Sequence, residues 1–142
     1  MNFIKKLFFN EKKYQEYLEI VKIDGLELRH VPRKYMTEEL VKIAVNKDAF
    51  ALEYVPKKYM TEELCKIAVQ QNGRTFANVP GKYMTEELVK IAVQQNGRTL
   101  KYVPIKYITE EVIFIAQQTR LWHGDITTVL TKRIFMIYRT MG

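Results

Sequence analysis

Every proline in the chain follows a valine, and the four Val-Pro pairs recur at a fixed spacing of 24 residues. The prolines are Pro32, Pro56, Pro80 and Pro104. The sequences between them are close copies: residues 58–75 and 82–99 differ only where Cys65 stands against Val89. A fixed period of this size indicates stacked structural units, because a unit this short cannot bury its apolar face alone. The chain is therefore expected to fold as an array in which neighbouring repeats complete each other's core.

Each repeat contains one predicted helix. A threonine, a preferred N-cap residue, is followed by two glutamates in the first turn, where the helix dipole favours negative charge. In the second repeat the helix is expected over Glu62–Gln71, ending in a left-handed cap at Asn72-Gly73. Apolar residues within 40–45 cover an arc of about 200°, whereas a lone surface helix needs about 100°. Neighbours are therefore expected on two sides of each helix.

A second helical turn is expected within each repeat, for example at 99–102. It should end where Val103 precedes Pro104, because the residue before proline is pushed out of the α region. Two helical elements per repeat predict an all-α fold, a small right-handed α-solenoid with capping helices at both ends, in one domain. The expected parts are an N-terminal cap and degenerate repeat at 1–30, repeats at 31–54, 55–78, 79–102 and 103–126, and a C-terminal capping helix at 127–142.

The two ends of the chain depart from the repeat, as capping segments do. In the last repeat Phe114 takes the place of a lysine, so the apolar face turns toward solvent and needs cover. A C-terminal helix beginning at Asp125 can supply that cover, although the segment RIFMIY also fits a strand. At the other end, apolar residues within 3–8 can cover the first repeat.

The unit VPxKYxTEELxxxAVxxNGxxLxY closely resembles a short repeat of bacteria and giant viruses that is known only as a domain of unknown function. The resemblance extends over about residues 24–118. That family is defined by sequence, so the resemblance implies repeat architecture and no chemistry. The unit is also similar, more weakly, to the leucine-rich repeat variant, which implies alternating long and short helical elements. This chain carries Val-Pro where that family usually shows Asn-Pro, so only the architecture is carried over.

Repetition argues against catalysis, because a catalytic residue is needed once and a residue present in every repeat belongs to the scaffold. The recurring Glu pairs and tyrosines are interpreted as helix starts and packing residues. The chain has no serine, and one cysteine and two histidines do not form a closed zinc site by themselves. Cys65 occupies a valine position, which predicts a buried, inert thiol. We expect no enzyme activity, catalytic residue, metal or cofactor.

Lysine, arginine and glutamine recur along the repeats and are the candidate partner-binding residues. One lysine set, the lysine ladder, has no local partner in the sequence, whereas Lys42 and its equivalents follow a glutamate by four residues and can pair with it. Such a periodic set could follow a phosphate backbone or contact a protein. Trp122 joins the candidates because it lies where the chain leaves the array. The ladder is Lys34, Lys58, Lys82 and Lys106, and the other candidates are Arg74, Arg98, Gln71, Gln95 and Trp122.

Charge favours a protein over a nucleic acid as the partner. The chain has 23 Lys and Arg against 16 Asp and Glu, a net charge of +7, but no single repeat is strongly basic. A dedicated nucleic-acid groove usually concentrates more positive charge. Positions at which otherwise similar repeats differ, namely Arg33, Lys57, Gly81 and Ile105, and also Glu53, Ala77 and Lys101, are typical of a recognition solenoid. We predict an interaction module, acting as an adaptor, subunit or inhibitor, with nucleic-acid binding as the alternative.

The sequence carries no apolar run long enough for a secretory signal or a membrane span. Its single cysteine fits a reducing compartment. We expect a soluble, cytoplasmic protein that is a monomer, or a dimer through the C-terminal end where Phe114 and Trp122 lie. Association with a membrane surface through residues 1–9 is a further alternative.

Overall fold

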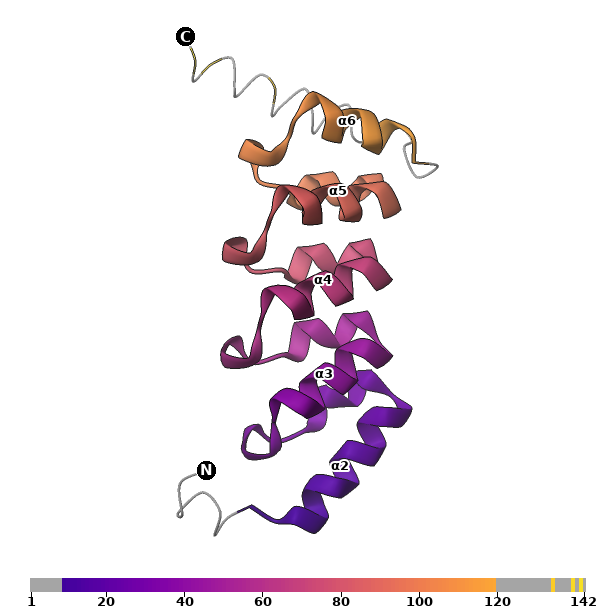
Figure 1. The fold of residues 1–142 in the computed structure, drawn as a ribbon, viewed down its shortest axis with the longest axis vertical. Helices are drawn as coiled ribbons and strands as arrows, with labels where there is room; N and C mark the ends of the chain where they lie inside the picture. The colour runs from indigo at the N-terminus through magenta and orange to yellow at the C-terminus, as the bar shows by residue number, and fades with distance from the viewer. Residues whose placement is uncertain (1–8, 120–133, 135–138, 140, 142) are drawn as a thin grey trace. The chain divides into compact units, whose positions relative to one another are not determined.

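The computed structural model describes residues 9–119 together with residues 134, 139 and 141. The chain divides into two compact units, Met1–Gln71 and Asn72–Gly142. Every regular element in the described residues is helical, and the helices follow one another in repeating order (Figure 1). The predicted fold class, an all-α array of solenoid-type repeats, is therefore confirmed. The N-terminal cap at residues 1–8 and the C-terminal capping helix, apart from its residues 134, 139 and 141, lie outside the described part.

A repeat consists of a short 3-10 helix at the Val-Pro turn, a longer α-helix, and a second 3-10 helix that leads to the next turn. In the first unit the elements are α2 (Glu11–Ile23), η1 (Gly25–His30), η2 (Arg33–Tyr35), α3 (Glu38–Lys47), η3 (Ala49–Tyr54), η4 (Lys57–Tyr59) and α4 (Glu62–Gln71). In the second unit they are η5 (Gly73–Asn78), η6 (Gly81–Tyr83), α5 (Glu86–Gln95), η7 (Gly97–Tyr102), η8 (Ile105–Tyr107) and α6 (Glu110–Gln117).

The expectation of two helical elements per repeat was wrong, because the Val-Pro turn is itself helical. Pro32 adopts an extended conformation with φ −60° and ψ 144°. Its carbonyl then accepts a hydrogen bond from the backbone N–H of Tyr35 at 2.8 Å. Proline has no N–H to lose and its fixed φ suits the start of a helical turn. Each of the three repeats that the structure describes in full therefore contains three helical elements.

The predicted N-caps are confirmed. The side-chain oxygen of Thr37 accepts the backbone N–H of Leu40 at 3.1 Å, and Thr85 accepts that of Leu88 at 3.2 Å. Thr61 and Thr109 make the equivalent bonds at the starts of α4 and α6. These bonds satisfy amide groups that the first helical turn leaves without a partner, which is why α3, α4, α5 and α6 each begin immediately after a threonine.

The predicted left-handed cap at Asn72-Gly73 was wrong. Asn72 is extended, with φ −151° and ψ 108°, and its side chain instead caps η5 by accepting the N–H of Arg74 at 3.1 Å. Gly73 has no left-handed backbone; a Cβ there would lie 2.7 Å from the carbonyl oxygen of Ala92. This glycine serves a close approach between backbone segments, which the local sequence pattern does not distinguish from a helix cap.

The α-helices are buried on more than one side, as the wide apolar arc predicts. In the first unit α3 contacts both α2 and α4, as well as η1 and η3 (Figure 1). Leu40, Val41 and Ala44 on α3 are 1% exposed or less. In the second unit α5 contacts α6, η5 and η7. The core of each unit therefore lies between the α-helices and the longer 3-10 helices.

Phe114 on α6 is 61% exposed. This agrees with the prediction that the apolar face of the last repeat turns toward solvent. The segment predicted to cover it, from Asp125 onward, falls almost entirely outside the described residues.

Within the part of the chain that the structure describes, no helix combines the length and the apolar character that crossing a membrane requires.

Substitution of Gly73 by alanine tests the close approach. The added methyl group would lie 2.7 Å from the Ala92 carbonyl oxygen and 3.1 Å from Cβ of Gln95, so we expect a loss of about 1–3 kcal/mol in the free energy of unfolding. The matched control is Gly81→Ala, because nothing lies within 4 Å of a Cβ at that position. Urea unfolding followed by circular dichroism measures both variants. Equal stability of the two variants would contradict the packing role of Gly73.

Candidate partner-binding surface

Each lysine of the ladder lies over the ring of the tyrosine that follows it. The distances from Nζ to the ring centroid are 4.9 Å for Lys34, 4.5 Å for Lys58, 4.6 Å for Lys82 and 4.7 Å for Lys106. All four lysines are exposed. The ladder was expected to lack a glutamate partner one helical turn earlier; the local partner that the structure gives each lysine is a ring face. The ammonium groups remain at the surface, but their positions depend on the tyrosines.

Two of these tyrosine rings are in turn bound to the preceding repeat within their own unit. In the first unit the hydroxyl of Tyr59 donates to the backbone carbonyl of Met36 at 2.6 Å. In the second unit Tyr107 makes the same bond to Met84 at 2.7 Å. These tyrosines were expected to pack between repeats, and the hydrogen bonds add a polar interaction to that contact. The rings of Tyr59 and Tyr107 are thus held in place beneath their lysines.

The lysines on the α-helices are paired with glutamates. Lys90 lies 3.1 Å from Glu86, its predicted partner one turn earlier, and 2.8 Å from Glu111 on the next helix. Both carboxylates raise the pKa of the Lys90 ammonium, Glu111 more strongly. Lys42 lies 3.3 Å from Glu63 on the next helix instead of the glutamate on its own helix. This lysine set therefore contributes to contacts between repeats and offers less free charge to a partner.

Two candidate glutamines also make contacts between repeats. In the first unit Gln71 donates to the backbone carbonyls of Val45 and Asn46, at 3.2 Å each. In the second unit Gln95 accepts the backbone N–H of Gly73 at 2.7 Å. Because these amides already satisfy backbone groups, they act in the scaffold, and their part in partner binding stays a prediction.

The structure divides the predicted candidates between the two units. Arg74 and Arg98 are exposed near the starts of η5 and η7 in the second unit. Trp122 lies outside the described residues. The first unit carries Lys34, Lys58 and Gln71, and the second carries Lys82, Lys106, Gln95, Arg74 and Arg98.

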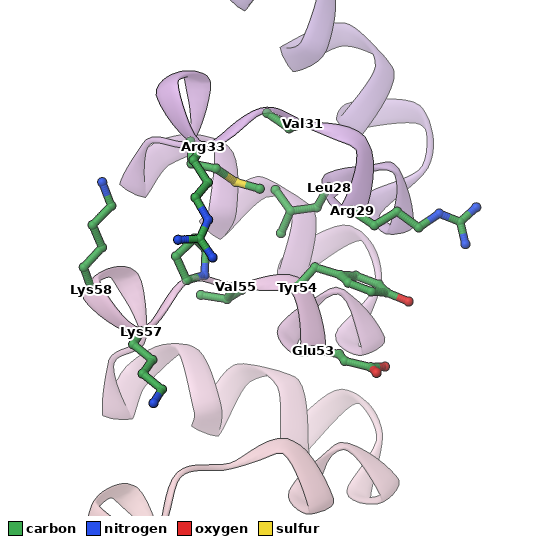
Figure 2. A pocket seen from close by; sticks show the side chains of 11 residues that line it. Leu28, Arg29, Val31, Arg33, Glu53, Tyr54, Val55, Lys57 and Lys58 are labelled. Atoms are coloured by element: carbon green, nitrogen blue, oxygen red, sulfur yellow. The ribbon is translucent and has the colours of Figure 1, made fainter. Parts of the chain in front are cut away.

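The first unit contains a groove of about 800 Å³ that we call the basic groove (Figure 2). Of the nine candidates only Lys58 lines it. The sequence signal for it was the variation at positions 33, 53 and 57, all three of which line the groove. The lining residues are Leu28, Arg29, Val31, Arg33, Met36, Glu53, Tyr54, Val55, Pro56, Lys57 and Lys58.

The basic groove has an apolar floor. Leu28 is fully buried, and Val31, Met36 and Val55 are each 5–7% exposed. They come from η1, from the Val-Pro turns and from the residue that ends η2. Figure 2 shows Leu28, Val31 and Val55 between the charged side chains. An apolar floor of this kind suits aliphatic side chains of a partner.

The rim of the basic groove is positively charged. The lining contains four cationic side chains, those of Arg29, Arg33, Lys57 and Lys58, and one carboxylate, that of Glu53. Arg29 lies 3.6 Å from Glu27, outside the groove, and Lys58 lies over its tyrosine ring. Among the described residues, the side chains of Arg33 and Lys57 form no ion pair or hydrogen bond, so their charge is available to a ligand.

The scaffold does not require these two cations. Two repeats later, Gly81 stands at the position of Arg33 and Ile105 at the position of Lys57. Gly81 begins η6 and Ile105 begins η8, the equivalent short 3-10 helices of the second unit. The backbone is thus built equally well around glycine or isoleucine. The positive rim of the first unit is a property of individual side chains and not of the repeat.

Two reactive side chains among the described residues, Cys65 and His30, lie in different environments. Cys65 is fully buried on α4, as predicted, and burial raises the pKa of its thiol to about 11. His30 is exposed and lies 2.9 Å from Glu27. Within the described residues no three His, Cys, Asp or Glu side chains gather closely enough to hold a metal ion.

A family model described as a domain of unknown function (DUF4116) matches the chain three times, over residues 17–60, 37–85 and 61–109. The three matches together extend over more than half of the chain. The chain belongs to the DUF4116 family. Each DUF4116 match is about two repeats long, and successive matches overlap, in agreement with a tandem array. No curated protein and no solved structure matches the chain significantly.

Removal of the Tyr59 hydroxyl tests the hydrogen bond between its repeat and the preceding one. Tyr59→Phe leaves the buried Met36 carbonyl without its 2.6 Å partner, and we expect a loss of about 0.5–1.5 kcal/mol in unfolding free energy. Tyr102→Phe is the control, because Tyr102 is 45% exposed and a surface change of this kind stays within about 0.5 kcal/mol. Urea denaturation compares the two. If Tyr59→Phe proves as stable as the control, the hydrogen bond does not hold the ring.

The buried thiol predicts slow and pH-dependent modification. With its pKa raised to about 11, Cys65 should react slowly with a disulfide reagent at pH 8 and faster once urea unfolds the chain. The folded chain holds the thiol proton more tightly than the unfolded chain, whose pKa is about 8.5. The thiol's contribution to stability is therefore intact below pH 8.5 and is lost as pH rises toward 11.

The matched control for this measurement is Cys65→Val, the residue at the equivalent position 89. It should abolish the reaction and reduce the loss of stability at alkaline pH by the part that the thiol contributes, while Tyr14, whose pKa is also raised by burial, still contributes to that loss. Rapid modification of the folded protein at neutral pH would contradict the inert assignment.

Proposed function

We propose that this DUF4116 protein is a non-enzymatic interaction module that binds a protein partner, as an adaptor, a subunit or an inhibitor. The observation that carries the proposal is the basic groove. It places an apolar floor and unpaired cations on a scaffold whose equivalent positions in the second unit are glycine and isoleucine. Such variation on a common backbone is how repeat proteins build different binding surfaces.

The proposed mechanism is binding by a preformed surface. The rings of Tyr59 and Tyr107, which lie beneath two of the ladder lysines, are hydrogen-bonded to backbone carbonyls, and the groove floor is part of the core. Little side-chain or backbone ordering is then needed when a partner binds. This lowers the entropic cost of association, so that a modest contact area gives specific binding.

A protein partner is favoured over a nucleic acid by the use of the aromatic residues. Base stacking needs an open ring face, whereas each ladder tyrosine already has a lysine over its ring. The unpaired cations of the basic groove are also local to the first two Val-Pro turns, whereas a phosphate track would need cations in successive repeats. Nucleic-acid binding through the Lys, Arg and Gln residues is the alternative that the experiment below separates.

The finer predictions belong to the same proposal. Exposed Phe114 supports a dimer through the C-terminal end, with a monomer as the alternative. A light-scattering mass distinguishes the two, and Phe114→Lys should leave only the monomer. The proposal also includes a cytoplasmic location, a right-handed course of the solenoid and a likeness to the leucine-rich repeat variant.

Affinity capture of the tagged full chain from a native lysate, with and without nuclease, tests the proposed function. We expect a stoichiometric protein partner that survives nuclease treatment. Loss of all partners after nuclease would contradict the proposal and favour nucleic-acid binding. In that case, affinity should fall steeply with salt, and Lys58→Glu with Lys82→Glu should abolish it.

A further inference from the structure

We infer that the basic groove of the first unit binds an extended acidic segment of a protein, one in which carboxylates alternate with aliphatic side chains. The inference rests on the proposed function, since it names the chemistry of the partner that the module would recognise. It uses the groove formed where η1 and η2 meet η3 and η4, lined by residues 28–58, and no residue of the second unit.

Charge complementarity selects an anionic ligand. The rim carries four cations and one carboxylate. The side chains of Arg33 and Lys57, unpaired within the described residues, come from the first positions of η2 and η4. Two consecutive turns thus contribute one unpaired cation each to the lining of the same groove. Carboxylates of a bound segment would pair with them, and arginine can bind a carboxylate with two parallel hydrogen bonds.

The floor selects aliphatic side chains between those carboxylates. Leu28, Val31 and Val55 have no polar side-chain atom, and they lie between the cationic side chains (Figure 2). A small inorganic anion would leave this apolar surface in contact with water. A peptide that places a leucine there removes the apolar area of that leucine from water, together with the small exposed part of Val31 and Val55. The groove volume of about 800 Å³ is within the range that accommodates several side chains.

Glu53 allows the inference to predict an increase in affinity as well as a decrease. It is the one carboxylate in the lining, and it would repel an acidic segment. Its neutralisation should strengthen binding of an acidic peptide, whereas removal of a rim cation should weaken it. The repeat accepts other residues at this position, since Ala77 and Lys101 are its equivalents.

The experiment uses fluorescence anisotropy with the full chain and a labelled synthetic peptide in which glutamates alternate with leucines. The test variant is Arg33→Ile with Lys57→Gly, which places the residues found at 105 and 81 into equivalent positions. We expect its affinity to fall on the order of tenfold. Glu53→Gln should raise the affinity by about two- to fivefold.

The matched control is Lys12→Gln with Lys47→Gln, which removes the same charge from exposed positions outside the basic groove. Its affinity should stay within about twofold of the original. Gln71 and Gln95 occupy the position of Lys47 in later repeats, so the change suits the fold. Urea midpoints of all variants establish that they are folded.

Three results would overturn the inference. The first is equal affinity of the test variant and the control, which includes absence of measurable binding to the original chain. The second is equal binding of a peptide with glutamine in place of glutamate. The third is stronger binding of a short polyuridine strand than of the acidic peptide, which would assign the groove to nucleic acid.

The same variants separate this inference from the proposed function. If the test variant, used as bait, still captures the nuclease-resistant partner in stoichiometric amount, the basic groove is not the binding site and the proposed function stands. If the original chain loses every partner on nuclease treatment, the proposed function fails and the inference fails with it.

Discussion

Close contact between the backbone of one repeat and the helix of the next holds each unit together. In the first unit a Cβ on Gly25 would collide with the Ala44 carbonyl oxygen, and in the second unit Gly73 approaches Ala92 in the same way. The absence of a side chain lets a 3-10 helix lie directly on an α-helix. Leu28, three residues after Gly25, is then fully buried. Because half of the contact belongs to a neighbour, no repeat has a complete core of its own.

This constraint leaves few positions for function. Within each unit the apolar residues of the α-helices point into the core, the threonines cap helices, and glutamines satisfy backbone groups of the adjacent repeat. The side chain of the first residue in η2, η4, η6 and η8 has none of these structural roles. That residue is arginine, lysine, glycine and isoleucine in turn. The basic groove is built at two such positions, so its chemistry can change without a change in the fold.

The candidate site could be predicted only in part. Exposure of the ladder lysines followed from their period, but the ring beneath each lysine did not. Its orientation depends on a tyrosine hydroxyl that reaches a carbonyl 23 residues earlier, Met36 in the case of Tyr59. Gln71 was a candidate for partner binding, yet its side-chain amide donates hydrogen bonds to the backbone carbonyls of Val45 and Asn46. The signal for the basic groove, variation at positions 33, 53 and 57, pointed to a surface without indicating that these residues share one concavity.

The sequence alone determined the repeat, the all-α fold, the threonine caps and the burial of Cys65, because these depend on spacing and on hydrogen bonds within a few residues. Only the tertiary structure decided that Gly73 serves a close approach and not a left-handed cap, that Lys42 pairs with Glu63, and that the first two Val-Pro turns enclose a groove. Each of these depends on residues about one repeat apart being brought together. A local pattern specifies which groups need a partner, and the packing of neighbouring repeats specifies which partner they meet.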